Sequence, residues 1–272
     1  MIEPELVRRL EAVEIASWEA LYLAAAPDFA AEAGLHLERL DRALLSAASH
    51  IDVLAFNRVI GLGVASPAGE AVVARVVERY RGLGVTRFFV QHCPYAEPPE
   101  LPELLRAHGL EPYNHWIKLY RDARTVPEPE TDFRIEAVSR DRAMDFGGAL
   151  AENFEWPAIL GRWVAQTVGA PGWYHYVAYA GVRPVGTAAL FIRDRIGEFA
   201  MASTAPEARG RGIQTALILR RIRDAAALGC TTLQMETLED LPERPAPSYR
   251  NALRAGFQPA YRRANWIWRA AA

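Results

Sequence analysis

Two stretches far apart in this chain share the same pattern of an expected helix, a Leu-Gly step and an expected strand. In each, over residues 76–90 and 220–235, an amphipathic helix ends in Leu-Gly and an apolar strand follows. Glycine after the last helical turn is the usual C-cap. The two Leu-Gly steps lie 145 residues apart, and a second matching pair, Gly109 and Gly256, lies 147 apart. We interpret this spacing as a duplicated domain; the alternative is chance, because the helix–glycine–strand unit is common.

The duplication predicts two domains, 1–124 and 133–272, joined by a linker at 125–132. The linker is rich in Pro and Glu and has little apolar surface to bury, so we expect it to be extended and exposed. A chain of 272 residues that is 51% hydrophobic is long and apolar enough for two cores.

A turn rich in glycine and arginine, Arg209-Gly210-Arg211-Gly212, lies between an expected strand at 198–204 and an expected helix at 215–228. Glycine lets the backbone approach an anion closely. The first N–H groups of a helix and its dipole attract that anion, and arginine adds charge. We therefore predict a phosphate site, with a solvated basic turn or a nucleic-acid patch as the alternatives for so short a pattern.

The second half predicts a mixed order of strands and helices. The expected strands are 133–138, 174–180, 184–192, 198–204, 232–237 and 261–268, and the expected helices are 141–153, 158–168, 215–228 and 248–255. In the first half we expect helices at 4–25, 29–49, 69–82 and 102–108, a strand pair around Asn57, and strands at 87–91 and 115–120.

The spacing Arg209-x-x-Gly212-x-Gln214 resembles the Arg/Gln-x-x-Gly-x-Gly/Ala loop of the GNAT N-acyltransferases, with Gln214 in place of the last small residue. The order of elements over 133–269 is similar to the whole GNAT fold. The resemblance implies an α/β (α+β) class: two tandem GNAT-like domains, each a mixed, mostly antiparallel sheet flanked by helices. The corresponding turn of the first half, Gly61–Gly69, has no arginine, so the first domain is expected to be a degenerate copy without a phosphate loop.

The same resemblance implies acetyl-CoA as cosubstrate. Its pyrophosphate would be held by Arg209, Gly210, Arg211, Gly212, Ile213, Gln214 and Thr215, and its acyl carbonyl polarised by the backbone of Met201, Ser203 and Thr204. Ser248 and Asn251 occupy positions that would contact the pantetheine arm. Their alternatives are a plain helix N-cap for Ser248 and a helix-surface residue for Asn251.

Direct acyl transfer to an amine needs a base for the ammonium and an acid for the leaving thiolate. Glu236 is a carboxylate inside an apolar strand, so we interpret it as the base, or else as a partner in a salt bridge at the strand edge. Glu155 and Glu198 are weaker candidates. The family tyrosine is replaced by Ala252; Tyr249, one helical turn away, is the candidate acid, or packs only.

The predicted function is transfer of an acetyl group from acetyl-CoA to a primary amine by direct attack in a ternary complex. A non-catalytic acyl-CoA-binding or regulatory module is the alternative. The acceptor is expected to be a small-molecule or peptide amine, and Phe154, Trp156 and Trp163 either line its site or pack in the core. We expect a monomer or a homodimer.

Composition argues against other classes of protein. A net charge of −2 opposes nucleic-acid binding, and we interpret Arg220, Arg221 and Arg223 as the solvated face of a helix. With two cysteines and no ligand spacing among six histidines, neither a disulfide framework nor a metal site is expected. The sequence has no apolar run long enough to span a bilayer, so we expect a cytoplasmic protein without membrane partners.

Overall fold

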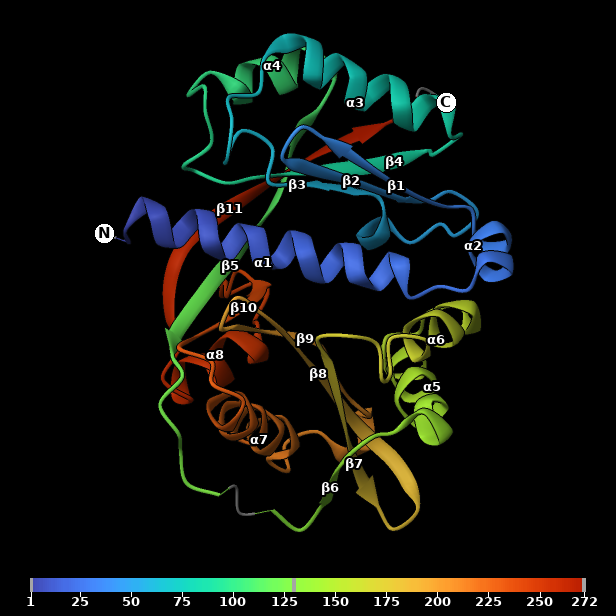
Figure 1. Cartoon of the computed structure of the whole chain (residues 1–272), viewed down its shortest axis with the longest axis vertical. Coiled ribbons are helices and arrows are strands. Elements are labelled where there is room, and N and C mark those ends of the chain that lie inside the picture. The colour runs from blue at the N-terminus through green and yellow to red at the C-terminus, as the bar shows by residue number, and fades with distance from the viewer. Residues whose placement is uncertain (1, 129–130, 271–272) are drawn as a thin grey trace. The chain divides into compact units, whose positions relative to one another are not determined.

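The chain has two compact units in the computed structural model, which describes residues 2–128 and 131–270 (Figure 1). The first unit is Met1–Ile117 with Ala260–Ala272, and the second is Lys118–Pro259. Each unit is a mixed, mostly antiparallel sheet with helices on both faces. The predicted fold class is therefore confirmed.

The sheet of the first unit has the order β1-β2-β3-β4-β11-β5. Its strands are β1 (Leu35–Leu40), β2 (Ala43–Ala48), β3 (Arg58–Ile60), β4 (Arg87–His92), the part of β5 (Glu111–Asp122) up to Ile117, and β11 (Gln258–Arg269) from Ala260 onward. Strands β3 and β4 are parallel, whereas β1–β2, β2–β3 and β4–β11 are antiparallel.

Helices cover both faces of this sheet because its strands alternate apolar side chains between the faces. The helices are α1 (Pro4–Leu23), α2 (Pro27–Ala33), α3 (Glu70–Gly82) and α4 (Leu101–Ala107), with a short 3₁₀ turn, η1 (Leu54–Phe56). Leu45 and Val59 belong to the core under α3 and α4. Leu44 and Ile60 form a separate cluster with Ile15 of α1. Helix α1 lies on the face of the sheet opposite to α3 and α4 (Figure 1).

The second unit repeats this pairing pattern. Its strands are β6 (Arg134–Ala137), β7 (Trp173–Ala180), β8 (Arg183–Arg193), β9 (Ile196–Thr204) and β10 (Thr232–Leu238), in the order β10-β9-β8-β7-β6, with the last residues of β5 beside β10. Strands β6 to β9 pair antiparallel, and β9 and β10 are parallel. Each unit thus has one parallel pair, β3–β4 or β9–β10, in an otherwise antiparallel sheet.

Helix α7 lies on one face of this sheet, and α5 and α6 lie on the other (Figure 1). The helices are α5 (Ala143–Asn153), α6 (Ala158–Ala165), α7 (Ile213–Ala227) and α8 (Pro247–Arg254), with 3₁₀ turns η2 (Arg140–Arg142) and η3 (Pro206–Ala208). Gly186 allows α7 to approach closely, since a Cβ there would lie 2.6 Å from Ile213. The N-terminus of α7 is therefore held against β8.

Two expected elements of the first unit are wrong. Around Asn57, where a strand pair was expected, the 3₁₀ turn η1 precedes a single strand, β3. A helix was predicted over 29–49, but α2 ends at Ala33 and a β-hairpin, β1–β2, follows. Gly34 ends the helix in the left-handed conformation, with φ 61°. Asp41 (φ 56°) begins the two-residue turn that lets Leu40 pair with Ala43.

The expected second domain, 133–272, includes the last strand, β11. In the structure, β11 from Ala260 onward belongs to the first unit. Strand β11 pairs with β4, with Trp266 opposite Val90 and Trp268 opposite Phe88. Both tryptophans join the core of the first unit, where Trp268 stacks on Phe88 at 5.4 Å. This burial supplies the physical reason for the placement of β11.

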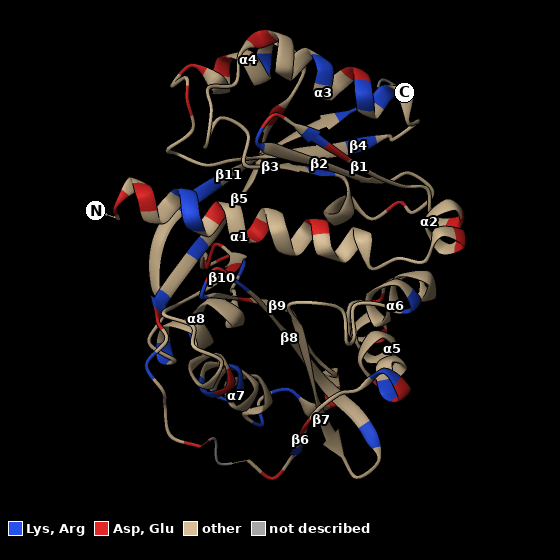
Figure 2. Ribbon diagram, viewed as in Figure 1, with Lys and Arg blue, Asp and Glu red and all other residues tan. Residues whose placement is uncertain are grey.

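The expected linker has neither helix nor strand at its described residues, and 129 and 130 lie outside them. Figure 2 shows basic and acidic segments interspersed along the elements of each unit. Over residues 2–128 and 131–270, no helix combines the length and the apolar character needed to cross a bilayer.

Candidate functional site

The turn between β9 and α7 is shaped by two glycines. Gly210 and Gly212 have φ angles of 75° and 78°, which favour glycine strongly, and Gly212 is the N-cap of α7. A Cβ at either position would meet no atom within 4 Å. The glycines therefore serve the backbone conformation, and the space beside them is open.

This turn presents backbone donors without acceptors. Among the described residues, no atom accepts a hydrogen bond from the N–H groups of 210–215, whereas the next N–H, that of Ala216, bonds to Gly212 O at 3.0 Å. The exposed guanidinium groups of Arg209 and Arg211 flank them, and that of Arg211 lies 4.4 Å from the centre of the Phe133 ring. Free N–H groups, a helix dipole and two cations fit a pyrophosphate.

Gln214 differs from the small residue of the family pattern, and its side chain turns toward the sheet. Its Nε2 donates to Ser203 O at 2.6 Å and to Thr204 Oγ1 at 2.9 Å. The first turn of α7 is thereby tied to the end of β9. The structure thus brings three predicted site residues, Ser203, Thr204 and Gln214, into direct contact.

Strand β9 contains a bulge beside this contact. Thr187 pairs with Ser203 and Ala189 pairs with Ala200, so that Met201 and Ala202 oppose a single residue of β8. Met201 has φ 50°, a conformation that costs free energy for a residue with a Cβ. The strain lies at the segment predicted to face the acyl carbonyl.

Strands β9 and β10 part just before the bulge. Their parallel pairing runs from Thr232 with Ile196 to Met235 with Phe199. Glu236 is the next residue of β10 and is half-buried. Glu198 lies within the paired region, where its carboxylate accepts a hydrogen bond from Gln234 at 3.2 Å. Of these two carboxylates, Glu236 is the one at the point of parting.

Helix α8 carries the remaining predicted residues and packs against α7 and β10. Tyr249 is half-buried, and its hydroxyl has no hydrogen-bond partner in the part of the chain that the structure describes. Ser248 is exposed and is not the N-cap, which is Ala246. Asn251 accepts a hydrogen bond from Arg254.

Sequence reasoning missed Asp240, which organises the start of α8. One carboxylate oxygen accepts from Ala246 N at 2.6 Å and the other from Arg250 Nε at 2.8 Å. The Arg250 hydrogen bond holds the pKa of Asp240 below its usual value.

The turn between α5 and α6 presents aromatic side chains. Phe154 and Trp156 stack with their centroids 4.6 Å apart, and Phe154 is exposed. Trp163 is fully buried and belongs to the core. Asn153, at the end of α5, donates from Nδ2 to Ser203 Oγ at 2.9 Å and so links this turn to the bulge. The sequence offered no signal for this contact beyond a polar residue at a helix end.

The interpretation of Arg221 as a solvated residue is wrong. Its side chain is 1% exposed, under β8 and β9, where its guanidinium donates to Ala189 O at 3.1 Å and lies over the Phe199 ring at 4.2 Å. Burial lowers its pKa to about 9. Arg220 remains on the outer side and pairs with Asp224 at 3.0 Å.

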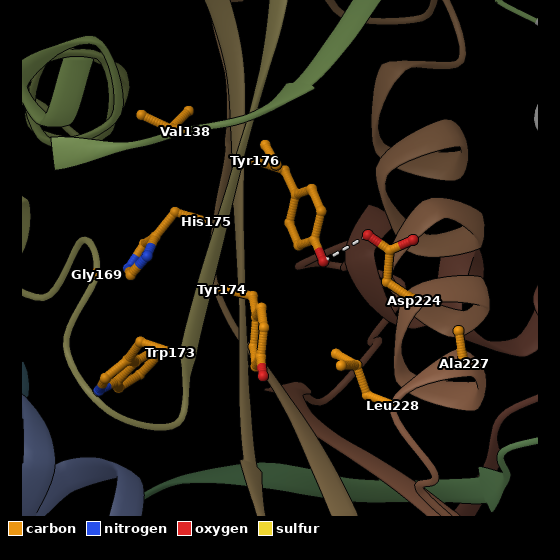
Figure 3. A pocket seen from close by; sticks show the side chains of 10 residues that line it. Val138, Gly169, Trp173, Tyr174, His175, Tyr176, Asp224, Ala227 and Leu228 are labelled. Carbon is orange, nitrogen blue, oxygen red and sulfur yellow. Dashed lines mark hydrogen bonds between the residues drawn. The ribbon is translucent and has the colours of Figure 1, made fainter. Parts of the chain in front are cut away.

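A cavity of about 390 Å³ lies at the other end of α7, beside Asp224 and Leu228. Figure 3 shows Trp173 and His175 pointing to one side of β7 and Tyr174 and Tyr176 to the other. The Tyr176 hydroxyl donates to Asp224 at 2.8 Å. The cavity is therefore distinct from the turn at 209–215.

The corresponding turn of the first unit is closed by its own chain. Gly63 accepts a hydrogen bond from Glu97 N at 2.8 Å, and Glu97 O accepts one from Ala68 N at 2.8 Å. A Cβ at Gly63 would lie 2.7 Å from Glu97 O. The segment around Glu97 thus fills the space that is open beside Gly210 and Gly212.

Within the described ranges, no group of three or more His, Cys, Asp or Glu side chains is arranged to hold a metal ion. Cys93 and Cys230 are both buried, and neither forms a disulfide in the part of the chain that the structure describes.

Comparison with known proteins relates this geometry to a family. Residues 135–246 match the model of the acetyltransferase (GNAT) family. None of the curated proteins matches the chain by sequence.

Solved structures share the fold over most of the chain. A GCN5-related N-acetyltransferase from Kribbella flavida has a TM-score of 0.61 at 17% identity, over 93% of this chain and 96% of that one. Another from Sphaerobacter thermophilus has a TM-score of 0.60 at 17% identity, over 85% of this chain and 82% of that one. A tandem GNAT protein from the clavulanic acid biosynthesis pathway has a TM-score of 0.60 at 16% identity, over 85% of this chain and 79% of that one. The chain thus has the fold of tandem GNAT proteins, and its residues 135–246 match the model of the acetyltransferase (GNAT) family.

Proposed function

We propose that this protein is an acyl-CoA-dependent N-acetyltransferase whose cosubstrate site is in the second unit. The observation that carries the proposal is the row of N–H groups at 210–215, which have no acceptor among the described residues. They lie beside the side chains of Arg209 and Arg211, after a strand that parts from its parallel neighbour. The match of residues 135–246 to the model of the acetyltransferase (GNAT) family supports it. The closed turn at Gly63 supports one cofactor site per chain.

In this proposal the turn holds the pyrophosphate of acetyl-CoA, and Ser248 and Asn251 contact the pantetheine arm. The acyl group enters where β9 and β10 part, beside Met201, Ser203 and Thr204. An alkyl ammonium has a pKa of about 10, so a base must remove a proton before attack. Glu236 takes that proton, directly or through water.

The amine nitrogen then attacks the thioester carbon, a C–N bond forms and the C–S bond breaks. The thiolate leaves and receives a proton from Tyr249, whose hydroxyl is not committed to another group in the described chain. The acceptor is a small-molecule or peptide amine, and the exposed Phe154 and its neighbour Trp156 line its entrance. We infer action in the cytoplasm by a monomer or homodimer.

Release of free thiol from acetyl-CoA, measured against a panel of primary amines, tests the proposal. We expect release that depends on the amine, with kcat lowered about a hundredfold or more in Glu236→Gln and about tenfold in Tyr249→Phe. Glu243→Gln, an exposed carboxylate before α8, is the matched control and should leave the rate unchanged. Binding of acetyl-CoA without amine-dependent release by the native protein would instead favour a regulatory acyl-CoA-binding module.

A further inference from the structure

A directed chain of hydrogen bonds holds the β9 bulge. The Thr187 hydroxyl lies 3.1 Å from Met201 O and 2.7 Å from Ser203 Oγ. A carbonyl oxygen only accepts, so Thr187 donates to Met201 O and must accept from Ser203. Ser203 in turn accepts from Asn153 Nδ2 at 2.9 Å. The donors and acceptors therefore follow one order, from Asn153 through Ser203 and Thr187 to the carbonyl oxygen of Met201, the residue with positive φ.

The two hydroxyl groups in this series of hydrogen bonds are buried. Thr187 is fully buried and Ser203 is 7% exposed, so neither hydroxyl can exchange its partner for bulk water without cost. Gln214 anchors the far side of the same segment by its bond to Ser203 O. The two peptide carbonyls of the bulge region, at Met201 and Ser203, are thus each held by a side chain.

Fixing the Met201 carbonyl also fixes the following N–H. In a trans peptide the C=O and the next N–H point in opposite directions. The Ala202 N–H therefore points away from Thr187 and β8, and β10 lies on the other side of β9 from β8. Since the pairing of β9 with β10 ends at Phe199, Ala202 is beyond the last paired residue.

The GNAT resemblance already implies that the backbone of β9 polarises the thioester carbonyl. We propose that Thr187, Ser203 and Asn153 are positioning residues, which hold the β9 bulge so that the Ala202 N–H faces that carbonyl oxygen. This inference rests on the proposed function. No side chain of the three touches the reacting atoms; Thr187 acts through the Met201–Ala202 peptide. A donor held in place before reaction stabilises the charge that develops on the oxygen without reorganisation.

Thr187→Val removes the hydroxyl and keeps the shape of the side chain. We expect the dissociation constant of acetyl-CoA to stay within about twofold, because the turn at 209–215 is intact, and kcat to fall about tenfold or more. Thr187→Ser should restore kcat to within about threefold of the native value. The matched control is Thr167→Val, another fully buried threonine of the second unit, which should leave kcat unchanged.

Infrared spectroscopy of bound acetyl-CoA labelled with ¹³C at the carbonyl reads the contact directly and needs no acceptor. In the native protein the carbonyl band should lie below that of free acetyl-CoA, and in Thr187→Val it should return toward the free value. Ser203→Ala interrupts the same chain at its middle and should shift the band in the same direction, which keeps the test valid if Thr187→Val does not fold.

The outcomes separate the two proposals. If acetyl-CoA binds to both variants and neither the band nor kcat changes, the positioning role is overturned and the proposed function stands. If the native protein binds no acetyl-CoA, the proposed function itself fails.

Discussion

His175 is a histidine held neutral by its surroundings. Its Nε2 lies 2.8 Å from Thr167 Oγ1, whose own proton is donated to Val164 O at 2.6 Å. The imidazole Nε2 must therefore carry the proton and donate it. Phe146 and Trp173 pack around the ring at 4.6 and 5.7 Å. Burial lowers the pKa of His175 to about 3.

This pKa predicts acid sensitivity. Below about pH 6.5 the unfolded chain binds a proton at His175 that the folded chain does not bind until about pH 3, so stability falls as the pH falls through this window. Between pH 7 and pH 5 the loss from this one group is about 2 kcal/mol of unfolding free energy. In His175→Phe that part should vanish.

Urea unfolding at pH 7 and pH 5 measures the difference. His50→Gln, at an exposed position, is the control and should keep the native pH dependence. Equal pH dependence in the native protein and His175→Phe would contradict the role of His175.

At the scale of elements, α5 and α6 cross in close contact through two glycines. A Cβ at Gly147 would lie 2.2 Å from Gly161 O and 2.9 Å from the Cβ of Ala165. The turn between the two helices carries the aromatic pair Phe154 and Trp156. The close crossing therefore positions the expected entrance for the acceptor.

Gly147→Ala should destabilise the protein by about 1–3 kcal/mol, because the added methyl group overpacks the crossing. The adjacent Gly148 supplies a matched control: a Cβ there would lie 3.9 Å from the Met144 methyl group and meet nothing nearer. Gly148→Ala should stabilise the protein by about 0.5–1 kcal/mol, since alanine is the better helix former. Denaturant unfolding compares the two, and equal effects would contradict the close crossing.

The periodicity of apolar residues and the positions of glycine and proline predicted most elements of the second unit, because its helices and strands have clear apolar patterns. The expected helix at 29–49 failed where a left-handed glycine, Gly34, interrupts a run that also suits strands. The turn at 209–215 was recognisable because its chemistry is local in the sequence. The chain from Asn153 through Ser203 to Thr187 was not, since its residues are 50 and 16 positions apart and meet only in the folded sheet.

In the whole molecule, neither unit coincides with one of the expected halves, because the second unit ends at Pro259 and the first resumes at Ala260. Strand β11 belongs to the first unit, where buried ion pairs hold it: Arg263 contacts Glu14 at 2.7 Å and Glu11 at 3.1 Å. The Tyr261 hydroxyl also bonds to Glu11 at 2.5 Å. A tandem duplication read from sequence spacing therefore locates the repeats but not the partner of the last strand, which depends on long-range pairing.

Both units share the pairing pattern of one parallel pair among antiparallel strands, yet their corresponding turns differ. In the first unit Glu97 fills the turn at Gly63. In the second unit the turn is open, with two arginines and with N–H groups that find no acceptor over residues 2–128 and 131–270. We therefore expect each chain to bind one acetyl-CoA, at the turn of the second unit.

Calorimetric titration of the full chain with acetyl-CoA tests that claim most directly. We predict one site per chain, an affinity about tenfold or more weaker in the Arg209→Ala, Arg211→Ala double variant, and native affinity in Arg193→Ala, Arg195→Ala, which removes the same charge at the exposed β8–β9 turn. No binding by the native protein, or an affinity unchanged by loss of Arg209 and Arg211, would contradict the account.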